Sequence, residues 1–285
     1  MTTAPVRGLV LRMAVPTIIS MLITNIYNMA DTFFVGKLGT SATAAVGVVF
    51  PLMSVIQTFG FFFGHGSGNY ISRAMGSQKM EDAEQMAVTG FGSSFLFGVI
   101  LMILGLLFQD PLARLLGSTD TILPYAKEYL CVILLGAPFM ASSLTLNNQL
   151  RFQGSAFFGM IGITTGGILN IFLDPLFIFV LDMGISGAAW ATIISQMISF
   201  LILLMMTRAG GNIRIRLKKY SLKRSFWKEI VRGGTPSLCR QGLASVATIC
   251  LNLAAGPYGD AAIAAMSIVS RIMNFASSAL IGLGQ

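Results

Sequence analysis

Apolar residues dominate this chain in stretches of 20 residues or more, which short polar connections separate. A helix rises about 1.5 Å per residue, so roughly 20 consecutive apolar residues cross the hydrocarbon core of a bilayer. The pattern therefore predicts eight membrane-spanning helices, the eighth beginning near residue 261. The first seven are expected over residues 9–35, 43–68, 86–108, 122–146, 155–181, 188–207 and 230–255.

The polar connections predict how these spans are grouped. We expect an interfacial helix within 69–85, a loop over 109–121 and a polar connection over 147–154. Residues 208–228 hold eight Lys or Arg, which favours a cytosolic connector near anionic lipid head groups. The predicted domains are thus a lobe of six spans (1–207), a basic cytosolic linker (208–229) and two spans of a second lobe (230–285).

Composition supports an all-α, polytopic membrane protein. Hydrophobic residues make up 54% of the chain and charged residues 11%, whereas soluble domains carry about 25% charged residues. The net charge of +8 would suit nucleic-acid binding in a soluble protein. Here the basic residues gather in alternate connections, as the positive-inside rule explains. We therefore expect a multi-pass protein of the cytoplasmic membrane, with a cytosolic N-terminus, the lipid bilayer as its surroundings and no nucleic-acid partner.

An internal repeat relates the seventh span to the first, because Pro236 lies 220 residues after Pro16. The same offset relates Gly36 to Gly256, Gly39 to Gly259, Ala42 to Ala262, Ala44 to Ala264, Ala45 to Ala265 and Gly64 to Gly284. Both spans are expected to start in the cytosol, so the repeats would be parallel, with a substrate path between two six-span lobes. Because the chain stops within an apolar stretch, we expect it to be the N-terminal part of a twelve-span protein.

Asp31 lies inside the first apolar stretch, where a carboxylate costs roughly 2.5–3.5 kcal/mol at a helix centre. Tyr27 and Asn28 precede it by four and three residues, so they share its helix face. This spacing favours an inward-facing polar group. The alternative is that Asp31 lies at the water interface and ends the helix.

The fifth span carries a second polar group. Asn170 and Asp174 are four residues apart and share a helix face. Pro175 has no N–H and leaves the carbonyl of Ile171 free. With Asp31 these groups suit a proton or a hard cation such as Na⁺. The alternative is that Asp174 caps the outer end of its span, unconnected to Asp31.

Several motifs together resemble the multidrug and toxic compound extrusion (MATE) transporters. They are ADTFFVGKLG at 30–39, RFQG at 151–154, the Asn170/Asp174 pair and GGTP at 233–236. The resemblance implies an antiporter that exports amphipathic, often cationic compounds in exchange for Na⁺ or H⁺. It also implies a cation site formed by Asp31, Asn170, Asp174 and Thr192, with Tyr27 beside it. Some relatives carry an acid on span 7, where this chain has Gln241 as the nearest strongly polar neutral residue.

We predict alternating access, with Pro16 and Pro175 as hinges, the coupling ion in place of a cofactor, no enzymatic activity and a monomer at full length. One alternative is a flippase of lipid-linked saccharides, for which Arg240 and Arg271 would supply a cationic cavity. Another is an inactive fragment of a transporter. A third is an intramembrane enzyme with an Asp31/Asp174 acid–base pair, but no HExxH or GxSxG motif accompanies that pair.

Overall fold

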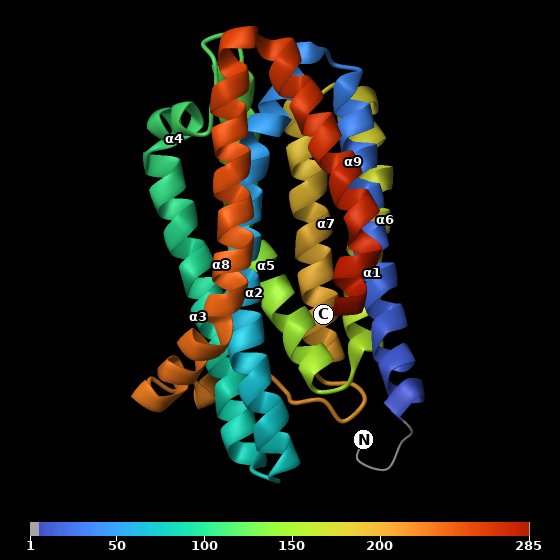
Figure 1. Cartoon of the computed structure of the whole chain (residues 1–285), viewed down its shortest axis with the longest axis vertical. Coiled ribbons are helices and arrows are strands. Elements are labelled where there is room, and N and C mark those ends of the chain that lie inside the picture. Colours follow the sequence, from blue (N-terminus) through green and yellow to red (C-terminus); the bar gives the residue numbers. More distant parts are fainter. Residues whose placement is uncertain (1–5, 285) are drawn as a thin grey trace.

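The computed structural model describes residues 6–284, and side chains for 13–270, 272, 273, 276 and 277. The regular elements within this part are all helical, and the longest helices run side by side (Figure 1). Their bounds are α1 Val6–Gly36, α2 Thr40–Gly76, α3 Met80–Leu107, α4 Gln109–Leu115, α5 Leu123–Phe152, α6 Ala156–Pro175, α7 Gly184–Met206, α8 Arg224–Ala255 and α9 Asp260–Gly284.

Among the described residues, seven helical segments are long and apolar enough to cross a membrane. They correspond to the first seven predicted spans, and this confirms an all-helical, polytopic architecture. The eighth predicted span coincides with α9, in which the described apolar segment is Asp260–Ser270. The division into lobes and the twelve-span whole stay predictions.

Three of the predicted connections are wrong. The interfacial helix within 69–85 does not exist as a separate element, because α2 continues to Gly76 and α3 begins at Met80. With 37 residues α2 is about 55 Å long, so its charged end extends beyond a hydrocarbon core. The predicted loop over 109–121 contains the short helix α4.

The third error concerns 147–154, where α5 continues to Phe152. Its polar side chains are buried, and neighbouring helices accept hydrogen bonds from one of them. Gln149 Nε2 donates to Ser67 Oγ at 2.9 Å and to the Ala87 carbonyl at 3.0 Å. A polar run can thus be the inward face of a helix as well as a connection.

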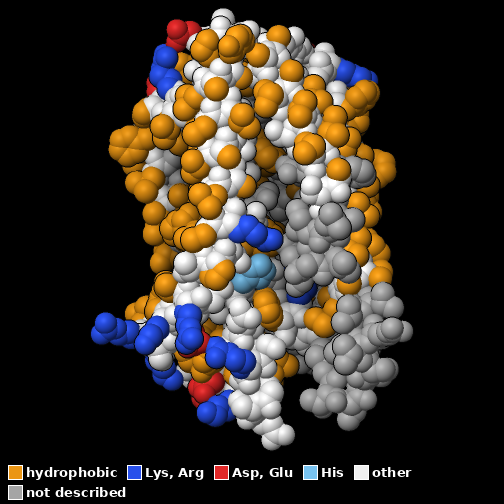
Figure 2. All heavy atoms as spheres, viewed as in Figure 1, with side chains coloured by type: hydrophobic (Ala, Val, Ile, Leu, Met, Phe, Trp, Pro, Cys, Tyr) orange, Lys and Arg blue, Asp and Glu red, His pale blue; other side chains and the backbone are white. Residues whose placement is uncertain are grey.

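Helix α8 begins at Arg224, so the last residues of the predicted basic linker are helical. The linker packs against α3. Lys219 forms an ion pair with Glu84 of that helix, and the Tyr220 hydroxyl lies 3.2 Å from Ser93 Oγ. Figure 2 shows basic side chains gathered at this end of the molecule. That asymmetry supports the predicted orientation, which stays a prediction.

The helices pack around α2 and α5, which contact each other extensively, while α8 lies along α2 and α9 lies against α1 and α2. Gly39 and Gly259, 220 residues apart, precede α2 and α9 with φ of 127° and 89°. A residue without Cβ adopts such angles readily. The two turns therefore keep the register of the internal repeat.

Candidate ion-coupling site and adjoining cavity

A polar cluster lies buried between α1, α6 and α7. It consists of Asp31 from α1, Asn170 and Asp174 from α6, and Thr192 from α7. The Asp31 and Asp174 residues are 4% and 0% exposed. Asn170 Nδ2 lies 3.3 Å from Asp174 Oδ1 and 3.5 Å from Thr192 Oγ1. The structure thus brings together the four residues that the family resemblance indicated.

Asp31 and Asp174 also act on each other electrostatically. Asp31 lies five residues before the end of α1, and its side chain is turned into the protein. This geometry fits the inward-facing interpretation of Asp31 better than a helix end at the water interface. It likewise places Asp174 within electrostatic range of Asp31 on the first helix, and not in an isolated cap.

Two adjacent glycines of α6 bring the three helices close. A Cβ at Gly167 would lie 2.9 Å from Ile23 Cγ2 and 3.0 Å from Tyr27 Cδ1, both on α1. A Cβ at Gly166 would lie 3.1 Å from the Ser195 carbonyl oxygen on α7. Any side chain at these positions would push α1 or α7 away from the polar cluster.

Two oxygens in the cluster lack a donor among the described residues, Asn170 Oδ1 and Asp174 Oδ2. A buried polar atom without a partner costs about 1–3 kcal/mol, more if it is charged. Oxygens of this kind suit a proton or a hard cation that binds oxygen ligands. The residues present therefore fit the predicted Na⁺ or H⁺ site.

Proline alters the helix directly after the cluster. Pro175 ends α6, and the chain continues as a π-helical turn, η1 Leu176–Val180. Wide turns of this type are frequent at functional sites. The sequence indicated the missing N–H of Pro175 but not the π-helical turn.

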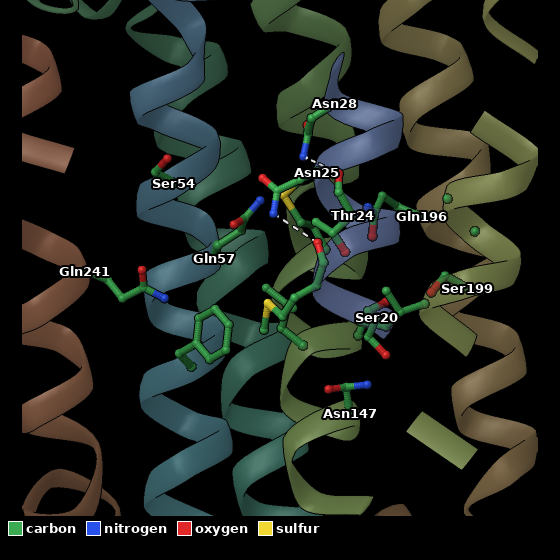
Figure 3. Close-up of a pocket in the computed structure, with 18 of the residues that line it drawn as sticks. Ser20, Thr24, Asn25, Asn28, Ser54, Gln57, Asn147, Gln196, Ser199 and Gln241 are labelled. Carbon is green, nitrogen blue, oxygen red and sulfur yellow. Dashed lines mark hydrogen bonds between the residues drawn. The ribbon is translucent and has the colours of Figure 1, made fainter. Parts of the chain in front are cut away.

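A cavity of about 470 Å³ lies beside the cluster, lined by α1, α2, α5, α6, α7 and α8. In Figure 3 Asn25, Gln57 and Gln241 point into this space from three different helices. Tyr27 and Gln196 line it too, and Gln196 Nε2 donates to the Tyr27 hydroxyl at 3.4 Å.

The Tyr27–Gln196 pair lies in the part of the cavity lining next to the polar cluster. Tyr27 lies four residues before Asp31 on α1, and Gln196 lies four residues after Thr192 on α7. Each step is about one helical turn. The polar cluster and the cavity are therefore successive layers along α1 and α7.

Sequence reasoning missed most of this cavity. A signal was present on α1, where the polar residues Thr17, Ser20, Thr24 and Asn28 recur at intervals of three or four. Arg151 also lines the cavity, although the sequence placed it in a connection.

Comparison with known proteins gives a consistent result. Residues 16–176 match a family model described as MatE. The multidrug export protein MepA of Staphylococcus haemolyticus is 30% identical over 274 residues, which cover 95% of this chain and 61% of that protein. MepA of Staphylococcus aureus strain MRSA252 is also 30% identical, over 98% of this chain and 62% of its own length.

Solved structures agree with these matches. An inward-facing multidrug resistance MATE transporter of the MOP superfamily superposes with a TM-score of 0.84 at 31% identity, over 96% of this chain and 63% of that one. A MOP superfamily transporter from Pyrococcus furiosus, described as having a binding pocket of reverse polarity, gives 0.86 at 31%, over 96% and 62%. The chain thus spans about three fifths of the length of the relatives it matches.

Proposed function

Because the chain belongs to the MatE family of transporters, we propose that it exports amphipathic compounds from the cytoplasm in exchange for Na⁺ or H⁺. Its relatives are named as multidrug export proteins, which supports efflux as the activity. The proposed setting is the cytoplasmic membrane, with a cytosolic N-terminus and a monomer as the functional unit at full length.

The observation that carries the coupling proposal is the buried pair of acids with two unsatisfied oxygens beside it. Uptake of one cation by Asp31 and Asp174 neutralises part of the charge buried there. The Asn170 amide, which also contacts Thr192, orients Asp174. The hydrogen-bonded Tyr27–Gln196 pair lies in the adjoining layer and responds to this change in charge.

Exchange requires that ion and cargo favour different arrangements of the helices. In our proposal the cation-bound cluster favours a bent α1, with Pro16 as the hinge, and this bend narrows the cavity. Cargo favours the straight form. The coupling free energy is reciprocal: the ion weakens cargo binding by the same factor by which cargo weakens ion binding.

The test is Asp31→Asn, which keeps the size of the side chain and removes its charge. We expect loss of energised dye efflux from cells producing this chain, with the protein present in the membrane in unchanged amount. Asp182→Asn is the matched control: Asp182 is exposed, and its φ of 50° is one that Asn adopts readily. Undiminished efflux by Asp31→Asn would refute the assignment of the coupling site.

A second candidate is flipping of lipid-linked saccharides, since Arg151 and Arg240 line the cavity. The Arg271 side chain, also predicted for that role, lies outside the described residues. Reconstituted vesicles separate the two functions. A flippase would move a fluorescent lipid-linked saccharide between leaflets without a Na⁺ or proton gradient, whereas the proposed exporter would move soluble dyes only with one.

A further inference from the structure

The charge of the cavity is opposite to that of the polar cluster. Among the described residues that line the cavity, the charged ones are Arg151 and Arg240, and none is Asp or Glu. The acids of the site, Asp31 and Asp174, belong to the separate layer behind Tyr27. The charge that acts most directly on a molecule in the cavity is therefore positive.

The two arginines come from different parts of the chain and face the same region. Arg151 lies near the end of α5 and is 9% exposed, and its Nη1 donates to Asn148 Oδ1 at 3.3 Å. Arg240 lies on α8 and is exposed to the cavity. Both positions lie near His65. The His65 ring is 5.8 Å from that of Phe152, the residue after Arg151, and the His65 side chain contacts Ser237 on α8. The two positive charges thus belong to one corner of the cavity.

Neutral polar groups of α2 and α8 lie next to this corner, where the two helices pack together. His65 Nδ1 lies 2.5 Å from Ser237 Oγ, one turn before Arg240. In Figure 2 the histidine and nearby basic side chains are visible in the body of the molecule, above the basic residues of its lower end. The positive corner is therefore separate from the basic residues at the lower end.

Another part of the lining is apolar. It includes Met21, Phe50, Phe61, Met140 and Leu144. Aromatic rings and flexible thioethers adapt to varied apolar bodies. The lining thus combines an apolar surface with one cationic corner.

We propose that the cavity binds amphipathic organic anions, with the acidic group at Arg151 and Arg240 and the apolar body against the aromatic and Met side chains. Guanidinium groups form charge-assisted, bidentate hydrogen bonds to carboxylate, sulfonate and phosphate. A cation in the same corner is repelled by both arginines. The inference rests on the proposed export function and replaces the cationic cargo that the family resemblance predicts.

Two xanthene dyes of similar shape and opposite charge test this inference. Binding of fluorescein (anionic) and rhodamine 6G (cationic) to the purified full chain is measured by fluorescence polarisation in an uncharged detergent. We expect fluorescein to bind more tightly. Arg240→Gln should weaken fluorescein binding about tenfold, the effect of one charge-assisted hydrogen bond, and leave rhodamine 6G unchanged or tighter. Arg240→Glu should invert the preference.

The matched control is Arg114→Gln, since Arg114 lies on α4 and pairs with Asp120 at the surface. It should change neither affinity. Displacement of fluorescein by phosphatidylglycerol but not by phosphatidylcholine would identify an acidic lipid as the anion. Displacement by neither lipid would identify a soluble acid, and both results support an anion site.

Tighter binding of rhodamine 6G than of fluorescein, or an unchanged fluorescein affinity in Arg240→Gln, would overturn the inference and leave the export proposal standing. Binding of neither dye would overturn the inference, and dye efflux from cells would decide the export proposal separately. Fluorescein binding without any dye efflux from cells would refute export alone.

Discussion

Helices α2 and α8 pack tightly at Gly66, and this packing allows a quantitative prediction for Gly66→Ala. A Cβ at this position would lie 2.3 Å from the Ile230 carbonyl oxygen and 2.9 Å from Ile230 Cα and C. All three atoms are backbone, so no side-chain rotation relieves the overlap. Non-bonded heavy atoms prefer about 3.5–4.0 Å, so Gly66→Ala must separate the two helices by roughly 1 Å.

The cost follows from two opposing effects. Overpacking of this kind costs about 1–3 kcal/mol, and the immobile backbone partner places Gly66→Ala near the upper limit. Replacing a helical Gly by Ala stabilises the helix by about 0.5–1 kcal/mol. The net expectation is a loss of about 2–2.5 kcal/mol. The separation would also stretch the 2.5 Å contact between His65 and Ser237.

Gly242→Ala is the matched control, because Gly242 lies within α8 and a Cβ there would meet no heavy atom within 4 Å. It should stabilise the protein by about 0.5–1 kcal/mol through helix propensity alone. The assay is thermal unfolding of the purified variants in detergent, followed by tryptophan fluorescence. If Gly66→Ala raised the unfolding temperature as much as Gly242→Ala, the close packing of α2 on α8 would be wrong.

Two further predictions concern buried and interfacial acids. Asp174→Asn should weaken the dependence of thermal stability on Na⁺ or pH, whichever the parent shows, because only the Asp31 carboxyl then remains to take up the cation or proton. The exposed-acid control Asp182→Asn should keep the full dependence. Asp260→Ala should cost about 1–2 kcal/mol in a denaturation assay, since it removes acceptors for the hydroxyls of Thr119 and Thr121 at 2.9 and 2.8 Å. Asp120→Ala, which breaks only a surface ion pair, should cost under about 1 kcal/mol.

The sequence predicted those features of the fold and site that depend on the residue pattern within a single helix. Apolar length predicted the spans, and the four-residue spacing of Asn170 and Asp174 placed both side chains on the face that meets Asp31. Which helices would pack against each other was a different question, and there the family resemblance supplied Thr192. Spacing within one helix contains no information about a partner on another helix.

Errors arose where polar residues are satisfied by distant partners. Gln149 and Arg151 read as a connection because their hydrogen-bonding groups and charge suggest water. In the fold they lie at the end of α5, where Ser67 from α2 accepts a hydrogen bond from Gln149. The cationic corner of the cavity depends on this burial together with the placement of Arg240 on α8, and a linear pattern shows neither.

The charge of the cavity constrains how exchange can work. For a cationic cargo, a bound ion and the cargo would repel each other through the layer formed by Tyr27 and Gln196, and electrostatics alone would favour exchange. For an anionic cargo the sign is reversed, so electrostatics would favour binding both together. Exchange of an anion for Na⁺ or H⁺ then requires a mechanical effect strong enough to overcome this attraction.

Helix α1 is the element that can supply such an effect, because it contributes Asp31 to one layer and Tyr27, Thr24 and Ser20 to the other. Pro16 lies below both layers and interrupts the hydrogen-bond ladder of α1. A bend at that point moves the cavity wall and the acid together. The combination of an arginine-lined cavity with an acid cluster one turn away therefore favours coupling through the shape of α1 over coupling through direct competition of charges.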